Sequence, residues 1–198
     1  MKKVFIATKN TGKVKEIRSF LVPMGYEIFS LIDAPEFPEI KETGTTFEEN
    51  ALIKAKALYD VVKIPVLADD SGLEVDLLQG RPGVLSARFS GEGATDEKNN
   101  AKLLKELGDS VLSERTARFR CIIALYDGLS ARYFEGTCEG NIGFQLKGAN
   151  GFGYDPLFVP GGYTQTFAEL GVEIKNRVSH RGKALQSLVK FLELENTM

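Results

Sequence analysis

Residues 117–142 constrain the fold of this chain most strongly, because their hydrophobic pattern has a period of two. In the first half, apolar residues alternate with others: Ala117, Phe119, Cys121, Ile123 and Leu125. Asp127 and Gly128 then give a tight-turn signal, and a second extended run rich in Tyr, Phe and Thr follows. The pattern predicts a long antiparallel hairpin. A two-residue turn would set Cys121 opposite Phe134 and not opposite Cys138, so a disulfide is not expected.

The rest of the chain combines short strands with helices. Apolar runs at residues 4–7 and 66–68 are typical of buried strands. Apolar residues recur at helical spacing in four segments, residues 14–21, 51–62, 101–107 and 184–192. Thr46 with Glu49 forms a capping box, and Thr95 stands where an N-cap is expected. Strand-loop-helix units next to a long hairpin predict an α/β fold with a mixed sheet and flanking helices.

The composition excludes several classes of protein. With 198 residues, 43% of them hydrophobic, the chain can bury a core as one domain over residues 1–198, or as one domain with two lobes. Its 25 basic and 27 acidic residues give a net charge of −2, which does not attract it to a nucleic acid or an anionic membrane. No apolar run approaches the roughly 20 residues of a membrane span, so we expect a cytoplasmic location. Two cysteines, one histidine and no C-x-x-C motif argue against a zinc cluster.

The segment TKNTGK at residues 8–13 connects the first strand to the first helix. Such a connection offers free backbone N–H groups and the positive end of the helix dipole, and Lys13 adds a full charge, so it can bind phosphate. It is not a P-loop, because that pattern needs Gly at position 7 and Ser or Thr at position 14, where the chain has Ala7 and Val14. An ordinary solvated turn remains the alternative for this segment taken alone.

Asp69 and Asp70 come directly after the apolar run of residues 66–68, where we expect the strand to end. Burying an ionised carboxylate without a partner costs several kcal/mol, so each acid must face solvent, accept hydrogen bonds or bind a cation. Successive side chains of a strand point to opposite faces, which predicts one working ligand, Asp70, and one supporting residue. For Asp69, an Asx turn onto Ser71 and Gly72 is at least as good an interpretation.

Three other parts of the sequence indicate that Asp70 belongs to a binding site. Glu42 lies in a loop, Lys54 lies on the capped helix, and the phosphate-type segment precedes both. Mg²⁺ prefers oxygen ligands, takes one or two carboxylates and leaves the remaining positions to water and substrate phosphate. Two carboxylates, a lysine and an anion-binding segment therefore predict a Mg²⁺-dependent phosphate site.

Two segments nearer the C-terminus contain candidate ligand contacts. The glycines of GANGFGYDPLF, residues 148–158, let the backbone around Phe152 approach a flat ligand, although Phe152 fits a core position equally well. The only histidine, His180, adjoins Arg181 at the start of the last helix. A lone histidine is more often a packing or capping residue than a catalyst.

Five segments occur in a specific order: ATKNTGK (7–13), ETGTTFEENALIKAKA (42–57), LADDSGLEVDLLQGRPGVLSARFSG (67–91), GANGFGYDPLF (148–158) and KNRVSHRGKAL (175–185). Together they resemble the inosine triphosphate pyrophosphatase family over nearly the whole chain. The resemblance implies hydrolysis of non-standard purine nucleoside triphosphates (ITP, dITP and XTP) to the monophosphate and pyrophosphate, which cleanses the nucleotide pool. It also implies Mg²⁺ as cofactor, an elongated mixed sheet with two lobes around a central cleft, and a homodimer.

The same resemblance assigns roles to individual residues. Asp70 matches the family's catalytic proton acceptor and, with Glu42, its Mg²⁺-binding acids. The implied substrate contacts are the triphosphate segment Thr8, Lys9, Asn10, Thr11, Gly12 and Lys13, the contacts Lys54 and Ser71, the base-binding loop Phe152, Gly153, Tyr154 and Asp155, and the residues that close the base pocket, Lys175, His180 and Arg181.

These roles predict an in-line displacement. Asp70 helps to deprotonate a water that attacks the α-phosphorus, and Lys13 with the segment's N–H groups stabilises the departing pyrophosphate. Arg181 or His180 would donate to the 6-carbonyl of hypoxanthine or xanthine and so reject adenine. The rings of Phe152 and Tyr154 would stack on the base.

Two other functions remain open at this stage. One is a general nucleoside triphosphatase that releases orthophosphate. The other is a non-enzymatic nucleotide- or RNA-binding module, for which Phe152 and a strand face carrying Arg118 and Arg120 would serve.

Overall fold

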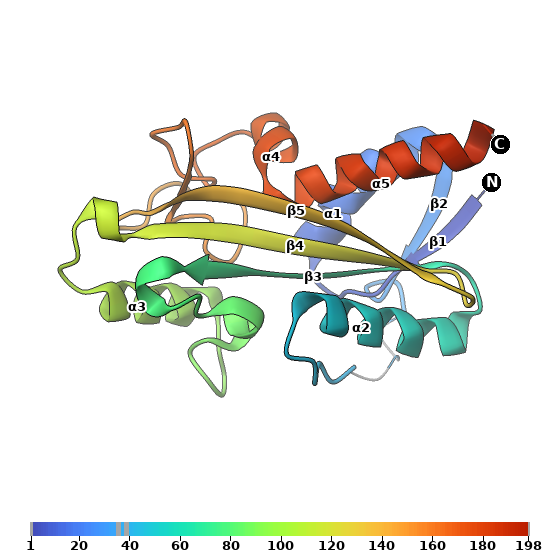
Figure 1. Cartoon of the computed structure of the whole chain (residues 1–198), viewed down its shortest axis with the longest axis horizontal. Helices are drawn as coiled ribbons and strands as arrows, with labels where there is room; N and C mark the ends of the chain where they lie inside the picture. Colours follow the sequence, from blue (N-terminus) through green and yellow to red (C-terminus); the bar gives the residue numbers. More distant parts are fainter. Residues whose placement is uncertain (1, 35–36, 38–39, 198) are drawn as a thin grey trace. The chain divides into compact units, whose positions relative to one another are not determined.

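The computed structural model describes residues 2–34, 37 and 40–197 (Figure 1). Its strands are β1 (Lys2–Ile6), β2 (Tyr26–Ser30), β3 (Val66–Val75), β4 (Thr116–Tyr126), β5 (Ala131–Ile142) and β6 (Phe158–Pro160). The helices are α1 (Thr11–Leu21), α2 (Phe47–Val62), α3 (Asp96–Leu107), α4 (Val172–Val178) and α5 (His180–Thr197), with short 3₁₀ segments η1 (Val22–Met24), η2 (Asp76–Leu78), η3 (Gly83–Arg88) and η4 (Leu112–Glu114). Within the described residues, no helix is both long enough and apolar enough to cross a membrane.

The strands form a six-stranded sheet in the order β2-β1-β3-β4-β5-β6. β1 pairs in parallel with β2 and with β3, whereas β5 and β6 are antiparallel. The predicted α/β fold with a mixed sheet and flanking helices is therefore confirmed.

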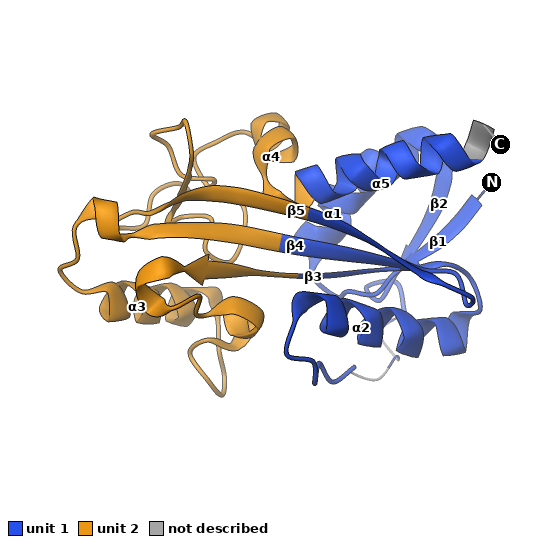
Figure 2. Ribbon diagram, in the orientation of Figure 1, with its two compact units in different colours: residues 1–70, 121–135, 183–198 blue, residues 71–120, 136–182 orange. Residues whose placement is uncertain are grey.

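The chain divides into two compact units (Figure 2). Unit 1 comprises residues 1–70, 121–135 and 183–198, and unit 2 comprises residues 71–120 and 136–182. Each unit is described here by itself. A single domain with two lobes around a central cleft remains a prediction.

In unit 1, helices cover both faces of the sheet: α1 and α5 lie on one face and α2 on the other (Figure 1). Ile6, Leu67 and Ile123 pack in one cluster with the apolar residues of α1 and α5. Val66 and Ala68 are also buried, and they point to the α2 face because successive side chains of a strand alternate. β3 therefore has one row of side chains toward α1 and the next row toward α2.

Both predicted helix starts are confirmed. The Thr46 hydroxyl accepts a hydrogen bond from the N–H of Glu49, and the Glu49 carboxylate accepts one from the N–H of Thr46, which completes the capping box of α2. Thr95 is the N-cap of α3 and accepts from the N–H of Lys98.

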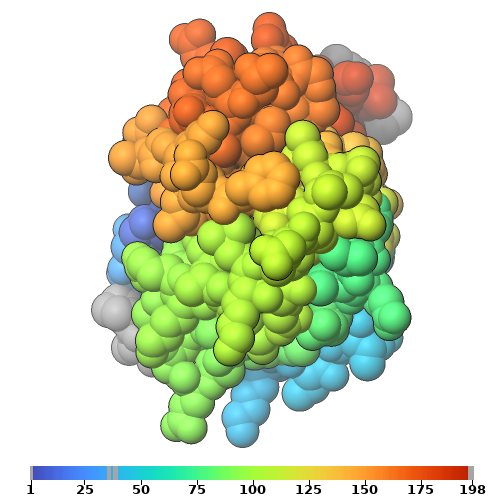
Figure 3. All heavy atoms as spheres, turned by 90° about the vertical axis from the view of Figure 1, so that its left-hand side faces the viewer, coloured from blue at the N-terminus to red at the C-terminus, as the bar shows by residue number. Residues whose placement is uncertain are grey.

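Unit 2 has a core rich in aromatic rings. Phe158 packs against Phe119 and Phe167, with ring centroids 4.7 and 5.2 Å apart. Near the end of β5, the Nδ2 of Asn141 donates to the carbonyl of Leu112 in η4 over 3.1 Å, and the segment after β5 lies beside η4 on the surface (Figure 3).

The predicted turn between the two strands of the hairpin is wrong. β4 ends at Tyr126 and β5 begins at Ala131, so the connection is longer than the predicted two-residue turn. The carboxylate of Asp127 accepts from the N–H groups of both Leu129 and Ser130 and stabilises this wider loop. The pairing of Cys121 with Phe134 that rested on the tight turn loses its basis.

Candidate active site

β3 runs through Asp69 and Asp70 and does not end there. The predicted strand end is therefore wrong, although both carboxylates are buried. The physical reason lies in the alternation of the strand. Asp69 continues the row that faces α1, Asp70 continues the row that faces α2, and each helix supplies a lysine to the acid on its side.

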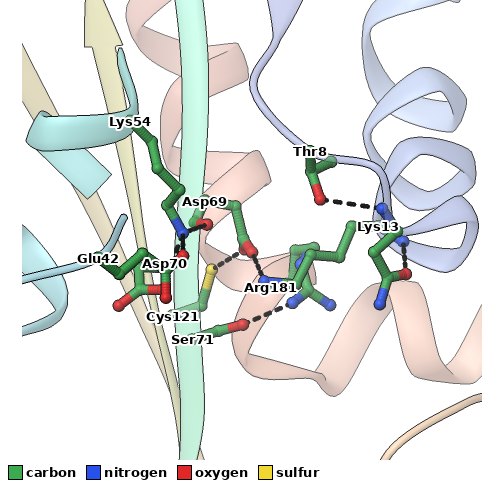
Figure 4. Close-up of polar contacts among 10 residues, drawn as sticks. Thr8, Lys13, Glu42, Lys54, Asp69, Asp70, Ser71, Cys121 and Arg181 are labelled. Atoms are coloured by element: carbon green, nitrogen blue, oxygen red, sulfur yellow. Dashed lines mark hydrogen bonds and ion pairs between the residues drawn. The ribbon is translucent and has the colours of Figure 1, made fainter. Parts of the chain in front are cut away.

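On the α2 side, Lys54 joins two carboxylates (Figure 4). Its Nζ lies 2.9 Å from Oδ1 of Asp70 and 2.7 Å from Oε1 of Glu42, and it also donates to the carbonyl of Asp69 over 2.8 Å. Lys54 is only 8% exposed. The second carboxylate oxygen of Asp70, Oδ2, is buried and has no hydrogen-bond partner among the described residues. The structure thus brings together Glu42, Lys54 and Asp70, as the sequence predicted.

Burial and charge act in opposite directions in this cluster. Burial raises the pKa of the Asp70 carboxyl group; the charge of Lys54 opposes this shift, and that of Glu42 adds to it. Burial also lowers the pKa of Lys54, but the charges of Asp70 and Glu42 outweigh it, so the Lys54 pKa lies above its ordinary value. Lys54 stays protonated, and one cation faces two carboxylates.

On the α1 side, Asp69 pairs with Lys13 and with Cys121. The ammonium group of Lys13 forms an ion pair with Oδ1 of Asp69, and Sγ of Cys121 donates to Oδ2 over 2.9 Å. The predicted Asx turn of Asp69 is therefore wrong, and the carboxylate supports Lys13. The other lysine of this segment, Lys9, donates to the carbonyl of Phe37.

The predicted triphosphate segment consists of a short loop and the first turn of α1. Asn10 is the N-cap, and its Oδ1 accepts from the N–H of Lys13 over 3.0 Å. The N–H of Asn10 in turn donates to the hydroxyl of Thr8. Thr11 and Gly12 lie in the first helical turn, where N–H groups have no partner within the helix. These two N–H groups and the helix dipole favour an anion at this end of α1.

In unit 2, the predicted base-binding loop is organised around Asp155. Its Oδ2 lies 2.6 Å from Nζ of Lys175 and accepts from the N–H of Phe152 over 2.9 Å. The same ammonium group lies 4.7 Å from the centre of the Phe152 ring. Phe152 is half-buried. Lys175 does not merely precede the last helix, as its place in the sequence suggested, but lies inside α4, a helix that the sequence did not predict.

Tyr154 and His180 belong to the packing of unit 2. Tyr154 is 4% exposed, and its hydroxyl group donates to the carbonyl of Ser86 over 2.8 Å. Burial raises the pKa of this hydroxyl group. The ring of His180 stacks on Phe119 at 4.6 Å with an angle of 11° between the planes. Because Tyr154 is buried, Phe152 is the one of the two predicted stacking residues that remains a candidate for contact with a base.

Arg181 is almost completely enclosed, at 1% exposed. Its guanidinium group donates to Oγ of Ser71 over 2.8 Å (Figure 4) and lies 5.7 Å from the centre of the Phe152 ring. Ser71, Phe152 and Arg181 are far apart in the sequence, and unit 2 brings them together. A buried guanidinium group with fixed donors can recognise carbonyl groups selectively.

Sequence reasoning missed the part that Cys121 plays, because no local signal connects it to Asp69. The two residues meet only because β4 lies next to β3 in the sheet. A buried cysteine by itself indicates packing.

A mixed sheet that carries paired carboxylates and lysines, next to a helix N-terminus suited to anions, defines an α/β protein with the side chains of a phosphate-handling enzyme. Residues 4–191 match the Ham1 family. The chain belongs to this family, which confirms the family resemblance that the five sequence segments predicted.

Several relatives cover nearly the whole chain. A dITP/XTP pyrophosphatase of Geobacter sulfurreducens is 52% identical over 97% of this chain and 97% of the relative. One from Halalkalibacterium halodurans is 50% identical over 98% of this chain and 100% of the relative. Among solved structures, a HAM1 protein from Coxiella burnetii has a TM-score of 0.88 at 38% identity, covering 98% of this chain and 99% of that one. The Staphylococcus aureus Ham1 protein has a TM-score of 0.86 at 40% identity, covering 98% and 100%.

Proposed function

We propose that this protein hydrolyses the non-standard purine nucleoside triphosphates ITP, dITP and XTP to the monophosphate and pyrophosphate, with Mg²⁺ as cofactor. Relatives about 50% identical over nearly their full length are named dITP/XTP pyrophosphatases. The observation that carries the proposal is the Oδ2 of Asp70, which is buried beside Lys54 and Glu42 and has no hydrogen-bond partner in the part of the chain that the structure describes.

The residues present fit a divalent cation. Lys54 neutralises one of the two charges of Asp70 and Glu42, so the cluster keeps one negative charge. The buried Oδ2 of Asp70 accepts no hydrogen bond from the described residues. In the described part of the chain, no group of three or more His, Cys, Asp or Glu side chains could hold a metal. Mg²⁺ usually takes one or two carboxylates and keeps water and phosphate as its other ligands, and Asp70 and Glu42 supply that number.

The residues of the chain have separate roles in the proposed reaction. The carboxylate of Asp70 accepts the proton of the attacking water, and Lys54 holds Asp70 and Glu42 in place. The N–H groups of Thr11 and Gly12, together with Lys13, bind phosphate oxygens. A bound Mg²⁺ would neutralise phosphate charge and act as a Lewis acid.

In unit 2, the proposed role of Phe152 is to stack on the purine while Arg181 donates to the carbonyl at position 6. Adenine has an amino group there, so two donors would face each other and a buried group would remain unsatisfied. A site built in this way can discriminate by about 10⁴-fold.

A substrate panel tests the proposal directly. The panel contains ITP, XTP, dITP, ATP, GTP and a pyrimidine triphosphate, with pyrophosphate and orthophosphate measured separately. We expect pyrophosphate as the primary product and a preference for ITP, dITP and XTP. Orthophosphate as the primary product would indicate the general triphosphatase, and a preference for ATP or GTP would refute the base pocket.

Metal removal should lower turnover strongly, because the remaining negative charge of the cluster of Glu42, Lys54 and Asp70 repels the triphosphate. We expect a chelator to reduce activity by at least about 100-fold and added Mg²⁺ to restore it. Circular dichroism recorded in parallel controls for unfolding. Full activity in the chelator would contradict the metal proposal and leave the product assignment untouched.

The binding-module alternative has lost part of its support. Arg118 lies 3.0 Å from Asp76 and 3.1 Å from Glu139, so acids of the same unit already neutralise it. The cytoplasmic location and the homodimer complete our proposal for this member of the family. Light scattering of the purified protein tests the dimer.

A further inference from the structure

Helix α3 binds the base loop at one residue, Gly153, through both of its backbone groups. Oδ2 of Asp96 accepts from the N–H of Gly153 over 2.6 Å, and Nδ2 of Asn100 donates to its carbonyl over 2.8 Å. Asp96 and Asn100 are four residues apart and therefore lie on the same face of α3. All three residues belong to unit 2.

The loop needs such a restraint because glycines flank Phe152 on both sides. Gly151 has φ +81° and Gly153 has φ +61°, a region that glycine enters readily but in which it is not confined. On one side, Asp155 accepts from the N–H of Phe152 and holds it. On the other side, the hydrogen bonds from α3 fix the next residue, so the direction of the Phe152 ring depends on both ends.

Stability alone does not explain Asn100. The residue is 4% exposed, and its Oδ1 is buried without a hydrogen-bond partner among the described residues. A buried amide that leaves its acceptor unsatisfied costs stability relative to an apolar residue of similar shape. An unsatisfied buried acceptor calls for a functional reason. Here the Nδ2 of the same side chain donates to the carbonyl of Gly153, which gives such a reason.

We propose that Asp96 and Asn100 are positioning residues for base selection: they fix Gly153 and thereby hold Phe152 in the orientation that selects the purine. Neither residue touches the reacting phosphates in this role. The inference rests on the proposed function, because it assigns Phe152 to the base. It predicts that loss of either contact lowers the preference for the correct purine more than it lowers the rate at saturation.

The test compares Asp96→Ala and Asn100→Ala with matched controls on the same helix. Glu97→Ala removes an exposed acid of the same first turn. Asn99→Ala removes a buried amide whose hydrogen bonds go to Ser86, Ala87 and Ser90 and not to Gly153. For each variant, kcat and KM are measured with dITP and with dATP, because adenine is the base that the proposed donor to position 6 rejects. We expect the ratio of kcat/KM values to fall about tenfold in the first two variants, mainly through KM for dITP, and to stay within about twofold in the controls.

A conservative variant separates positioning from charge. Asp96→Asn keeps an oxygen acceptor for the N–H of Gly153, so it should retain most of the discrimination that Asp96→Ala loses. Hydrogen exchange of residues 148–157 gives a second readout, which we expect to be faster in Asp96→Ala and Asn100→Ala than in the controls.

The outcomes separate the two proposals. If the unaltered protein prefers dITP while all variants keep its ratio and its exchange rates, the role of α3 is overturned and the proposed function stands. If the unaltered protein does not prefer dITP to dATP, base selection itself is overturned. Faster exchange without a change in the ratio would reduce Asp96 and Asn100 to structural residues and would also overturn the inference.

Discussion

Asp70→Asn is expected to lower kcat for dITP about 1,000-fold while the protein stays folded. Oδ2 of Asp70 is the buried carboxylate oxygen that has no hydrogen-bond partner among the described residues, and the substitution removes both its charge and its ability to take a proton. General base catalysis contributes about 10²- to 10⁴-fold on its own, and the weaker metal site adds to the loss. Steady-state release of pyrophosphate at saturating substrate measures the effect.

The matched control is Asp60→Asn, since Asp60 is an acid on α2 whose side chain is 77% exposed. It should leave kcat unchanged. Near-normal kcat in Asp70→Asn would remove this residue from the mechanism. Calorimetric titration with Mg²⁺ extends the test, because loss of a carboxylate ligand should weaken binding even without substrate.

Lys54→Ala should have the second large effect, on stability as well as on activity. The variant leaves Asp70 and Glu42 facing each other without the ammonium group that lies 2.9 and 2.7 Å from them. Breaking a buried ion pair from one side costs about 3–5 kcal/mol. Urea unfolding should show this loss, and turnover should fall by at least about 100-fold.

Mg²⁺ provides a sharper test of the same residue. A cation that binds Asp70 and Glu42 replaces part of the missing charge, so Mg²⁺ should raise the melting temperature of Lys54→Ala more than that of the unaltered protein. Lys56→Ala is the control, because Lys56 is an exposed lysine on the same helix. An equal Mg²⁺ effect in all three proteins would show that these acids are not the metal ligands.

Periodic patterns and caps in the sequence predicted most of the architecture. The capping box of Thr46 and Glu49 and the N-cap Thr95 depend only on neighbouring residues, and the structure has both. Helix α4 has seven residues, which is too short for a hydrophobic period to show. The connection between β4 and β5 was misread because Asp127 and Gly128 fit more than one kind of turn.

The candidate site was predictable where the chemistry of the side chains suggests which of them act together, and it was not predictable where only the folded sheet brings them into contact. Lys54 and Asp70 could be grouped from their chemistry. The contacts of Asp69 could not, because its partners Lys13 and Cys121 come from two other elements that only the folded sheet brings to it. The strand continues through the acids because these partners satisfy charges that the sequence alone leaves uncompensated.

The alternation along β3 also limits how this segment can change in length. Asp69 and Asp70 face different helices, so inserting one residue between Ala68 and Asp69 would exchange their sides. Asp69 would then meet Lys54, and Asp70 would point toward α1. We therefore expect this strand to accept substitutions at its apolar positions far more readily than any single-residue insertion or deletion. The register of β3, and not only its composition, is then a requirement for activity.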